Sequence, residues 1–299
     1  MSLIAFKSLH PSFGKEVVGV NLQSKLKFDV LSKLTQALMD NKVLLFRDQN
    51  LNPEQLAEFG RAWSGRTRID SFTEMHVPGY DDINVIGNVG ELFADADYRN
   101  GAAFWHTDCA AENDPDATTM LYCIHALPEN GETVLADMEL AYFDLDNDMK
   151  NKIDELTARH CYAGARPILG GKQSWEHELT PVTEETERNF PAPVNRPIAR
   201  THSITGRKGL YAPAGSIFEV PGMPDREANE LMFSLKVHAT QDKYCYAHQY
   251  KPGDVLIWDN TSTMHYGKPV AAATGDHDRR LMHRISPLGI PVGVKAMNV

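Results

Sequence analysis

Two side chains that commonly bind metal ions lie two positions apart in residues 104–108 (FWHTD). Because side chains at positions i and i+2 of an extended strand point to the same face, His106 and Asp108 could hold one ion from a single strand. A third ligand has to come from elsewhere, and the best candidate is His265, which ends residues 258–265 (WDNTSTMH). Two histidines and one carboxylate on one face of an octahedral ion leave three positions open, which suits non-haem Fe(II) oxygenases.

An arginine downstream of the third candidate ligand strengthens this interpretation. A His-x-Asp pair alone is weak, because most such pairs are hydrogen-bonded surface residues. Here, however, Arg280 follows His265 by fifteen residues. An arginine can hold a dicarboxylate through two parallel hydrogen bonds beside a metal ion. The combination therefore indicates a metal site that also takes an anionic cosubstrate.

The segments that must position these side chains include a few helices. Apolar residues recur with helical spacing in residues 28–39, and further helices are expected near 139–156 and 224–239. Another helix is expected to begin at Pro53, because Asn52 is a favourable N-cap and proline is favoured at the first helical position. Gly65 can end that helix.

Short runs suited to strands lie between these helices, separated by Pro, Gly and Asn turns. They are residues 42–46, 83–86, 118–124, 133–136, 209–212, 244–249 and 255–258. Many short strands with a few peripheral helices favour a β-sandwich or jelly roll over a parallel α/β sheet. No linker or repeat divides the sequence, so residues 1–299 are predicted to form a single domain.

Composition and charge limit the classes of molecule that this protein is expected to bind. The formal net charge of −10 argues against a general affinity for nucleic acid or for anionic membrane surfaces. The four cysteines form no C-x-x-C pair, and neither a signal peptide nor a long apolar run is present. A cytoplasmic enzyme acting on a small molecule is therefore expected, and whether it forms a homo-oligomer is left open.

Several segments together resemble one known family. His106-Thr107-Asp108 is followed in order, and at similar spacing, by residues 130–133 (NGET), 258–260 (WDN), His265 and residues 279–284 (RRLMHR). This pattern is similar to that of the TauD/TfdA family of Fe(II)- and 2-oxoglutarate-dependent dioxygenases. The resemblance covers nearly the whole chain, and the combined pattern is far more specific than any one piece.

The resemblance implies a mainly β fold with peripheral helices, namely a double-stranded β-helix (a jelly roll, cupin-like). It implies that His106, Asp108 and His265 bind Fe(II). It places Arg280 on the distal carboxylate of 2-oxoglutarate, with Thr133 donating a hydrogen bond to the same cosubstrate. With O2, such an enzyme oxidises an unactivated C–H bond, most often by hydroxylation, and releases succinate and CO2. Relatives that halogenate carry a small residue in place of the carboxylate, so Asp108 disfavours halogenation.

Arg284 is the candidate for substrate binding. It lies four residues after Arg280, and residues four apart on an extended strand share a face. A second guanidinium in the same cavity favours a substrate with a carboxylate or sulfonate group, such as a small acid, an amino acid or a sulfonate. The alternatives are that Arg284 pairs with a protein carboxylate such as Glu74, or that it touches the near end of 2-oxoglutarate.

Other outcomes and other classes of protein remain open at this point. The same iron chemistry could end in desaturation or in oxidative cyclisation in a biosynthetic pathway. Three protein ligands plus water also describe catalytic zinc, so a hydrolase is possible, although hydrolysis needs no dicarboxylate partner for Arg280. A non-catalytic jelly-roll binding protein is the third class.

Trp258 is interpreted as structural. Five other histidines are interpreted as packing or surface residues: His125, His160, His202, His238 and His248.

Overall fold

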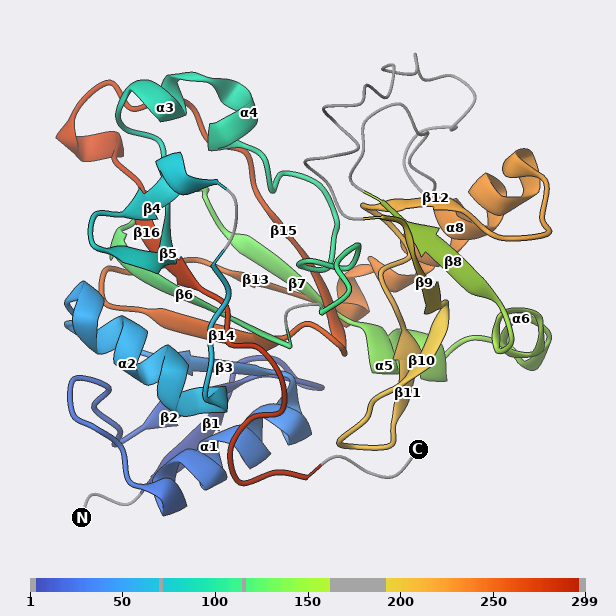
Figure 1. Ribbon diagram of the computed structural model, residues 1–299, viewed down its shortest axis with the longest axis horizontal. Coiled ribbons are helices and arrows are strands. Elements are labelled where there is room, and N and C mark those ends of the chain that lie inside the picture. The colour runs from blue at the N-terminus through green and yellow to red at the C-terminus, as the bar shows by residue number, and fades with distance from the viewer. Residues whose placement is uncertain (1–3, 70–71, 115–116, 162–191, 296–299) are drawn as a thin grey trace.

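The computed structural model, which describes residues 4–69, 72–114, 117–161 and 192–295, is built around two β-sheets (Figure 1). Within those residues the larger sheet has eight strands in the spatial order β1-β2-β3-β14-β6-β16-β5-β4. Neighbouring strands are antiparallel except for β2 and β3. The bounds are β1 (Ala5–Ser8), β2 (Lys15–Val18), β3 (Val43–Phe46), β4 (His76–Val77), β5 (Tyr80–Gly87), β6 (Thr118–His125), β14 (Val255–Asp259) and β16 (Leu281–Ile285).

The smaller sheet has the order β13-β7-β15 across the described part of the chain. Its strands are β13 (Cys245–His248), β7 (Thr133–Asp137) and β15 (Thr263–Gly267). One isolated antiparallel bridge, between His106 and His265, extends this sheet beyond β15. The bridge has a backbone hydrogen bond in each direction, of 2.9 Å and 2.8 Å.

The chain crosses repeatedly between the two sheets. It runs from β5 in the larger sheet to the bridge at His106, back to β6, and then to β7 and β13 in the smaller sheet. It returns to the larger sheet in β14, crosses to the smaller sheet in β15 and comes back to the larger sheet in β16. Two antiparallel sheets connected in this way form a jelly roll. The predicted mainly β, jelly-roll class is confirmed.

Side chains alternate between the inside of the jelly roll and its outer faces. In β14, Leu256 and Trp258 point inward and pack with Leu135 of the opposite sheet. Val255 and Ile257 point outward into a separate apolar cluster. The period of two that a strand imposes therefore decides which residues can reach the interior.

Two helices cover the outer face of the larger sheet (Figure 1). They are α1 (Phe28–Asn41) and α2 (Pro53–Ser64). The predicted start of α2 is confirmed: the Asn52 side chain accepts from the Gln55 backbone, and the Gln55 side chain accepts from the Asn52 backbone. Gly65, at φ 87°, ends the helix as predicted.

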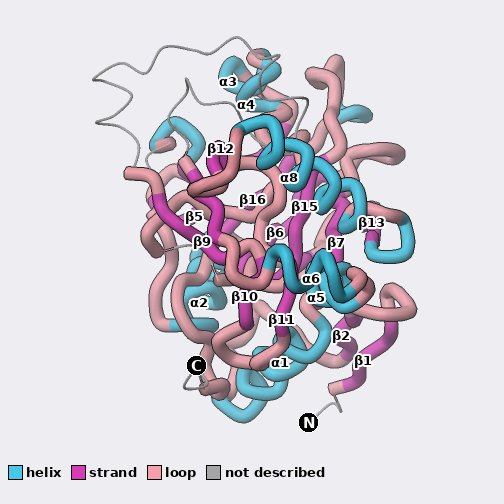
Figure 2. Tube along the Cα trace, turned by 90° about the vertical axis from the view of Figure 1, so that its right-hand side faces the viewer, coloured by secondary structure: helices cyan, strands magenta, loops and turns pink. Residues whose placement is uncertain are grey.

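The outer face of the smaller sheet packs against α8 (Asp225–Ala239), which lies in front of β15 and β7 in Figure 2. Residues near 139–156 form two short helices, α5 (Met138–Phe143) and α6 (Asn147–Ile153). They are separate because Asp146 accepts a hydrogen bond from Met149 and so caps a second helix.

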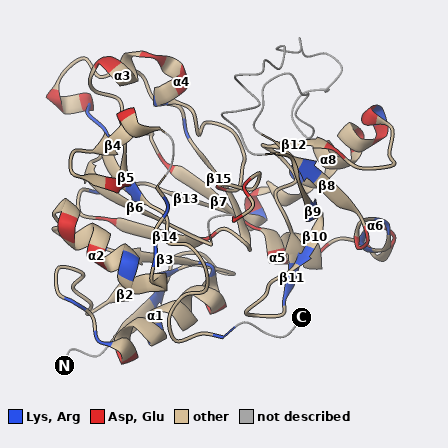
Figure 3. Cartoon of the chain, in the orientation of Figure 1, with Lys and Arg blue, Asp and Glu red and all other residues tan. Residues whose placement is uncertain are grey.

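The remaining described elements flank the jelly roll. A three-stranded sheet contains β8 (Thr157–His160), β9 (Val194–Pro197) and β12 (Ile217–Glu219), and a two-stranded one contains β10 (Ala199–Thr201) and β11 (Lys208–Leu210). The short helices α3 (Glu91–Ala94) and α4 (Ala96–Arg99) carry acidic residues that Figure 3 shows in red. Within the described ranges, no helix combines the length and the apolar composition needed to cross a membrane.

Candidate metal site between the two sheets

Three potential metal ligands, His106, Asp108 and His265, converge beside β15, with one ligand atom of each within 4.8 Å of the others. His106 Nε2 lies 3.5 Å from Asp108 Oδ1, and His265 Nε2 lies 3.7 Å from Asp108 Oδ2. Bonds of about 2.1 Å meeting at right angles would place ligand atoms about 3 Å apart. The three groups therefore need only a small movement to hold one ion.

The segment that carries His106 and Asp108 is not a strand. Only His106 forms a bridge, and Cys109 has φ 52°, in the left-handed region, so the chain turns directly after Asp108. The prediction that the two ligands project from a single strand is therefore wrong. They lie together because the backbone of His106 is paired with β15 and the Asp108 carboxylate is held by the Thr119 hydroxyl of β6.

The hydrogen bond of the His106 ring leaves Nε2 available to bind a metal ion. Its Nδ1 lies 2.7 Å from the carbonyl oxygen of Phe104, and a carbonyl can only accept. Nδ1 must therefore carry the proton, and Nε2 presents its lone pair toward Asp108. A backbone carbonyl that fixes the tautomer in this way is common for metal-binding histidines.

A chain of side chains holds the Asp108 carboxylate. The Thr119 hydroxyl donates to Asp108 Oδ2 at 2.6 Å, and the Asn260 amide donates to Thr119 Oγ1 at 2.8 Å. The Trp258 indole N–H donates in turn to Asn260 Oδ1 at 3.0 Å. All four residues are buried. Trp258, interpreted from the sequence as structural, also packs its ring 4.7 Å from that of His265.

The charges of the site suit a divalent cation. Burial lowers the pKa of His265 to about 3, so its imidazole is neutral and can act as a ligand near pH 7. Burial opposes ionisation of Asp108, but the neighbouring His265, His106 and Arg284 outweigh it and lower the pKa of this carboxyl. A neutral His265 imidazole and an ionised Asp108 carboxylate result.

Arg280 lies just before β16 and is held by its surroundings at both ends. Its backbone N–H donates to Asn88 Oδ1 at 2.7 Å, and its side chain passes Gly131, where a Cβ would lie 3.4 Å from Arg280 Cδ. The residue is 6% exposed, and burial lowers the pKa of its guanidinium. Within the described residues Nε has no hydrogen-bond partner and no carboxylate pairs with the group. An anion from outside the protein would satisfy it.

Thr133 begins β7 and faces the same interior, opposite Gly267 of β15. Its hydroxyl oxygen accepts a hydrogen bond from the Tyr250 hydroxyl at 2.9 Å. Tyr250 was not identified from the sequence, since it lies 117 residues away and belongs to no recognisable motif. Thr119 and Asn260 were missed as well, although Asn260 is part of the WDN segment.

The Arg284 side chain lies beside Asp108, and its role in binding substrate stays a prediction. In β16 Arg284 pairs with Leu121 of β6, which packs in the interior with Leu135, Leu256 and Trp258. Its Nη1 lies 4.0 Å from Asp108 Oδ1. Its side chain is 26% exposed, so it is partly accessible to a ligand. Glu74 accepts a hydrogen bond from the Tyr98 hydroxyl at 3.0 Å.

His202 is a positioning residue for the loop before β15. Backbone N–H groups of Ile204 and Thr205 donate to its Nδ1, so Nε2 carries the proton and donates to Asp259 Oδ2 at 3.1 Å. Both His202 and Asp259 are buried. The interpretation of His202 as a packing residue is correct, and its hydrogen bonds give that role a structural basis.

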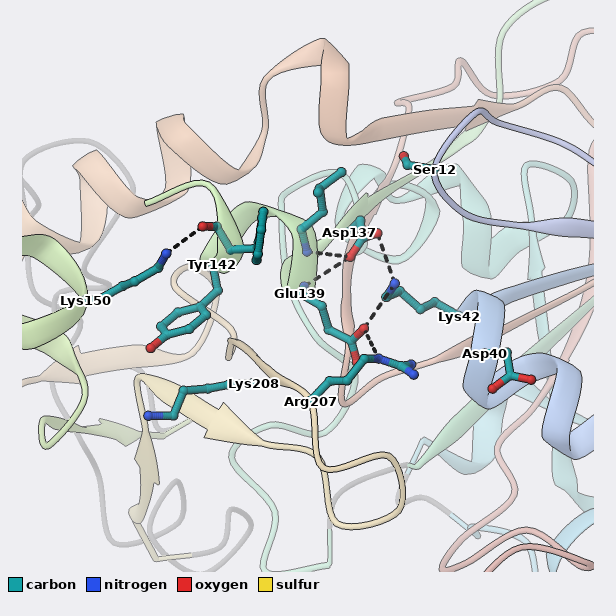
Figure 4. Close-up of a pocket in the computed structure, with 11 residues that line it drawn as sticks. Ser12, Asp40, Lys42, Asp137, Glu139, Tyr142, Lys150, Arg207 and Lys208 are labelled. Atoms are coloured by element: carbon teal, nitrogen blue, oxygen red, sulfur yellow. Dashed lines mark hydrogen bonds and ion pairs between the residues drawn. The ribbon is translucent and has the colours of Figure 1, made fainter. Parts of the chain in front are cut away.

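A separate depression of about 630 Å³ lies beside α5, and none of the candidate ligands lines it (Figure 4). Lys42 Nζ is 3.1 Å from both Asp137 Oδ2 and Glu139 Oε2, and Arg207 Nε is 2.7 Å from Glu139 Oε2. These charges are paired with one another, so they join the end of α1 to the start of α5.

Comparison with known proteins agrees with this geometry. Residues 5–286 match the model of the family described as "Taurine catabolism dioxygenase TauD, TfdA family". The chain is 31% identical over 290 residues to an α-ketoglutarate-dependent 2,4-dichlorophenoxyacetate dioxygenase from Burkholderia sp. (strain RASC), with 94% of this chain and 93% of the relative covered. It is 26% identical to an α-ketoglutarate-dependent sulfate ester dioxygenase from Pseudomonas putida, covering 96% and 91%.

A solved structure shows the same likeness in three dimensions. The crystal structure of AAD-2 in complex with Mn(II) and N-oxalylglycine superposes with a TM-score of 0.78 at 26% identity, covering 97% of this chain and 99% of that one. α-Ketoglutarate is another name for 2-oxoglutarate. The chain therefore belongs to the TauD/TfdA family and is a 2-oxoglutarate-dependent dioxygenase.

Proposed function

We propose that the enzyme binds Fe(II) through His106, Asp108 and His265 and hydroxylates an unactivated C–H bond of a small anionic substrate. The observation that carries this proposal is the convergence of the three ligand atoms within 4.8 Å of one another. Family membership implies both iron and 2-oxoglutarate. The donor set is the one expected for an iron centre with three open positions.

The protein supplies positioning and electrostatics, while the bound iron and 2-oxoglutarate together supply the activation of O2. The proton on His106 Nδ1 keeps Nε2 directed at the ion. Thr119 holds the Asp108 carboxylate by donating to one oxygen, which leaves the other oxygen for the ion. Each ligand is thus oriented by a hydrogen bond or a ring contact before the ion arrives.

We assign the distal carboxylate of 2-oxoglutarate to Arg280 and Thr133. Support comes from the burial of the guanidinium, its unpartnered Nε and the absence of a carboxylate paired with it in the described residues. A buried cation without a counter-ion is costly, and a dicarboxylate supplies the missing charge.

We assign the anionic group of the substrate to Arg284. Support comes from its position on the inner face of β16, 4.0 Å from Asp108 Oδ1, where a bound molecule would lie beside the iron. The two relatives described above are named for 2,4-dichlorophenoxyacetate and for sulfate esters, both of which carry an anionic group. A carboxylate, sulfonate or sulfate ester is therefore the expected class of substrate.

An anaerobic titration tests the assignment of the cofactors. Addition of Fe(II) and 2-oxoglutarate should give a weak visible charge-transfer band. His265→Ala should abolish the band and turnover while the protein remains folded. Arg280→Ala should keep the metal but weaken 2-oxoglutarate binding by about ten-fold or more, because a charge-assisted hydrogen bond contributes about 1.5–3 kcal/mol. A normal band and normal succinate formation in His265→Ala would contradict the metal assignment.

Substrate-dependent succinate formation tests the substrate class. The panel should contain aryloxyalkanoic acids, alkyl sulfates, alkyl sulfonates and amino acids, each beside its uncharged analogue. The mass of the product distinguishes hydroxylation, which adds one oxygen atom, from desaturation or ring closure, which removes two hydrogen atoms. Activity confined to uncharged compounds would refute the anionic class.

A further inference from the structure

We propose that Tyr250 is a positioning residue for the cosubstrate, because its hydroxyl orients the Thr133 hydroxyl toward the distal carboxylate of 2-oxoglutarate. This inference rests on the proposed function, since it takes Thr133 and Arg280 as the groups that bind that carboxylate. It adds a residue that follows β13 and lies in the chain far from both of them.

Tyr250 is held rigidly in the interior. It is 4% exposed, and its ring meets the His248 ring edge-on, with centroids 4.6 Å apart and an interplanar angle of 86°. Its hydroxyl lies 2.9 Å from Thr133 Oγ1. Burial raises the pKa of the phenol, so it keeps its proton and acts as a donor throughout the working range of an enzyme.

The direction of this hydrogen bond decides what Thr133 can do. A threonine hydroxyl has one proton to donate and two lone pairs to accept with. Because the Tyr250 hydroxyl donates to Thr133 Oγ1, the proton of Thr133 is left for another acceptor. Thr133 is 3% exposed, and no acceptor for that proton is found among the described residues. A carboxylate in the cavity would supply one.

Arg280 converges on the same place. Tyr250 and Arg280 lie close enough that each affects the pKa of the other. The guanidinium Nε is buried without a partner in the described part of the chain. The Thr133 proton and the Arg280 N–H groups thus form one set of donors, of which the hydroxyl is oriented by Tyr250.

The structure contains the same arrangement around a carboxylate of its own. Asn260 donates to Thr119 Oγ1, and the Thr119 proton goes to Asp108 Oδ2. A donor behind a threonine hydroxyl therefore turns that hydroxyl toward a carboxylate at the metal site. We infer that Tyr250 and Thr133 do for 2-oxoglutarate what Asn260 and Thr119 do for Asp108.

Calorimetric titration of the Mn(II)-loaded protein with 2-oxoglutarate measures this effect without turnover. Tyr250→Phe removes only the hydroxyl and should raise the dissociation constant about three- to ten-fold, the range for one neutral hydrogen bond. Tyr246→Phe is the matched control, because its hydroxyl bonds to His248 Nδ1 at 2.9 Å and not to Thr133. It should leave the constant unchanged. In turnover with Fe(II), Tyr250→Phe should raise KM for 2-oxoglutarate and leave kcat at saturation near the wild-type value.

A double-mutant cycle separates positioning from simple packing. If Tyr250 acts through Thr133, the variant Tyr250→Phe/Thr133→Val should bind 2-oxoglutarate no more weakly than Thr133→Val alone. Wild-type affinity in Tyr250→Phe, or fully additive losses in the double variant, would overturn the inference while leaving the proposed function intact. Failure of the wild-type Mn(II) protein to bind 2-oxoglutarate would overturn the proposed function itself.

Discussion

A single hydroxyl outside the ligand motif fixes the only carboxylate among the three proposed metal ligands. Thr119 donates to Asp108 Oδ2 and accepts from Asn260, so it fixes the orientation of the Asp108 carboxylate. The sequence contains two adjacent threonines, Thr118 and Thr119, and nothing in their local sequence says which one points inward. The pairing of Thr119 with Trp258 of β14 decides it.

Replacement of Thr119 by valine tests this role. The change keeps the shape of the side chain but leaves Asp108 Oδ2 without its donor and the Asn260 amide without its acceptor. Loss of such a supporting hydrogen bond typically lowers metal affinity roughly 10- to 100-fold, and we expect that range for Mn(II) measured by electron paramagnetic resonance. Thr118→Val is the control: Thr118 is equally buried, and its hydroxyl has no partner in the described residues. Equal affinities in the two variants would show that Thr119 does not support the site.

Arg284 gives a second prediction at this scale. Once a substrate is known, Arg284→Gln should raise its apparent KM strongly and shift that of 2-oxoglutarate little, because the two anions are assigned to different arginines. Steady-state kinetics with the substrate varied, and then with 2-oxoglutarate varied, measures the two apparent KM values. Arg279→Gln serves as the control, since Arg279 forms an ion pair with the exposed Asp276 at 3.1 Å. An equal rise in both constants, or full activity on the uncharged amide of the substrate, would instead place Arg284 on 2-oxoglutarate or in a purely structural role.

At the scale of elements, local signals predicted most of the structure well. The capping residues of α2 were identified correctly, as were the approximate positions of β6, β7 and β14. The failure lies at residues 104–108, where the spacing of His106 and Asp108 was interpreted as two ligands on one strand, but the chain forms no strand there and turns at Cys109. Tyr250 could not be found, because its role depends on where the turn after β13 places it against β7, a contact between distant parts of the chain.

The turn before β7 carries a prediction of its own. Gly131 has φ 72°, and a Cβ there would lie 3.2 Å from Leu127 Cδ1 and 3.4 Å from Arg280 Cδ. Gly131→Ala should lower the free energy of unfolding by about 1–2 kcal/mol through its left-handed backbone and should also weaken 2-oxoglutarate binding by displacing Arg280. Gly65→Ala has the same backbone strain, at φ 87°, with nothing within 4 Å of its Cβ. Denaturant unfolding should therefore show a lower free energy of unfolding for both variants, whereas 2-oxoglutarate binding should weaken only in Gly131→Ala.

At the scale of the whole molecule, the resemblance and the pattern of short strands together predicted the jelly roll, and the comparisons with known proteins agree. The net charge of −10 gives no hint of an anion site, because Arg280 is buried and Arg284 is partly buried, whereas acidic residues of α3 and α4, such as Glu91 and Asp97, are exposed. Substrate identity could not be predicted, since it depends on the shape of a cavity that several distant segments form together. The single-domain organisation stays a prediction.

The backbone bridge between His106 and His265 has a consequence for local opening. Each histidine donates its backbone N–H to the carbonyl of the other, so separating the two backbone segments at this point requires breaking both hydrogen bonds. A bound ion resists that separation, and it should suppress opening by a free energy that grows with metal concentration. In hydrogen–deuterium exchange, Mn(II) should therefore slow the amides of His106 and His265 together, and far more than those of β1 at the opposite edge of the fold. Independent protection of one amide without the other would show that the bridge and the metal site are not coupled.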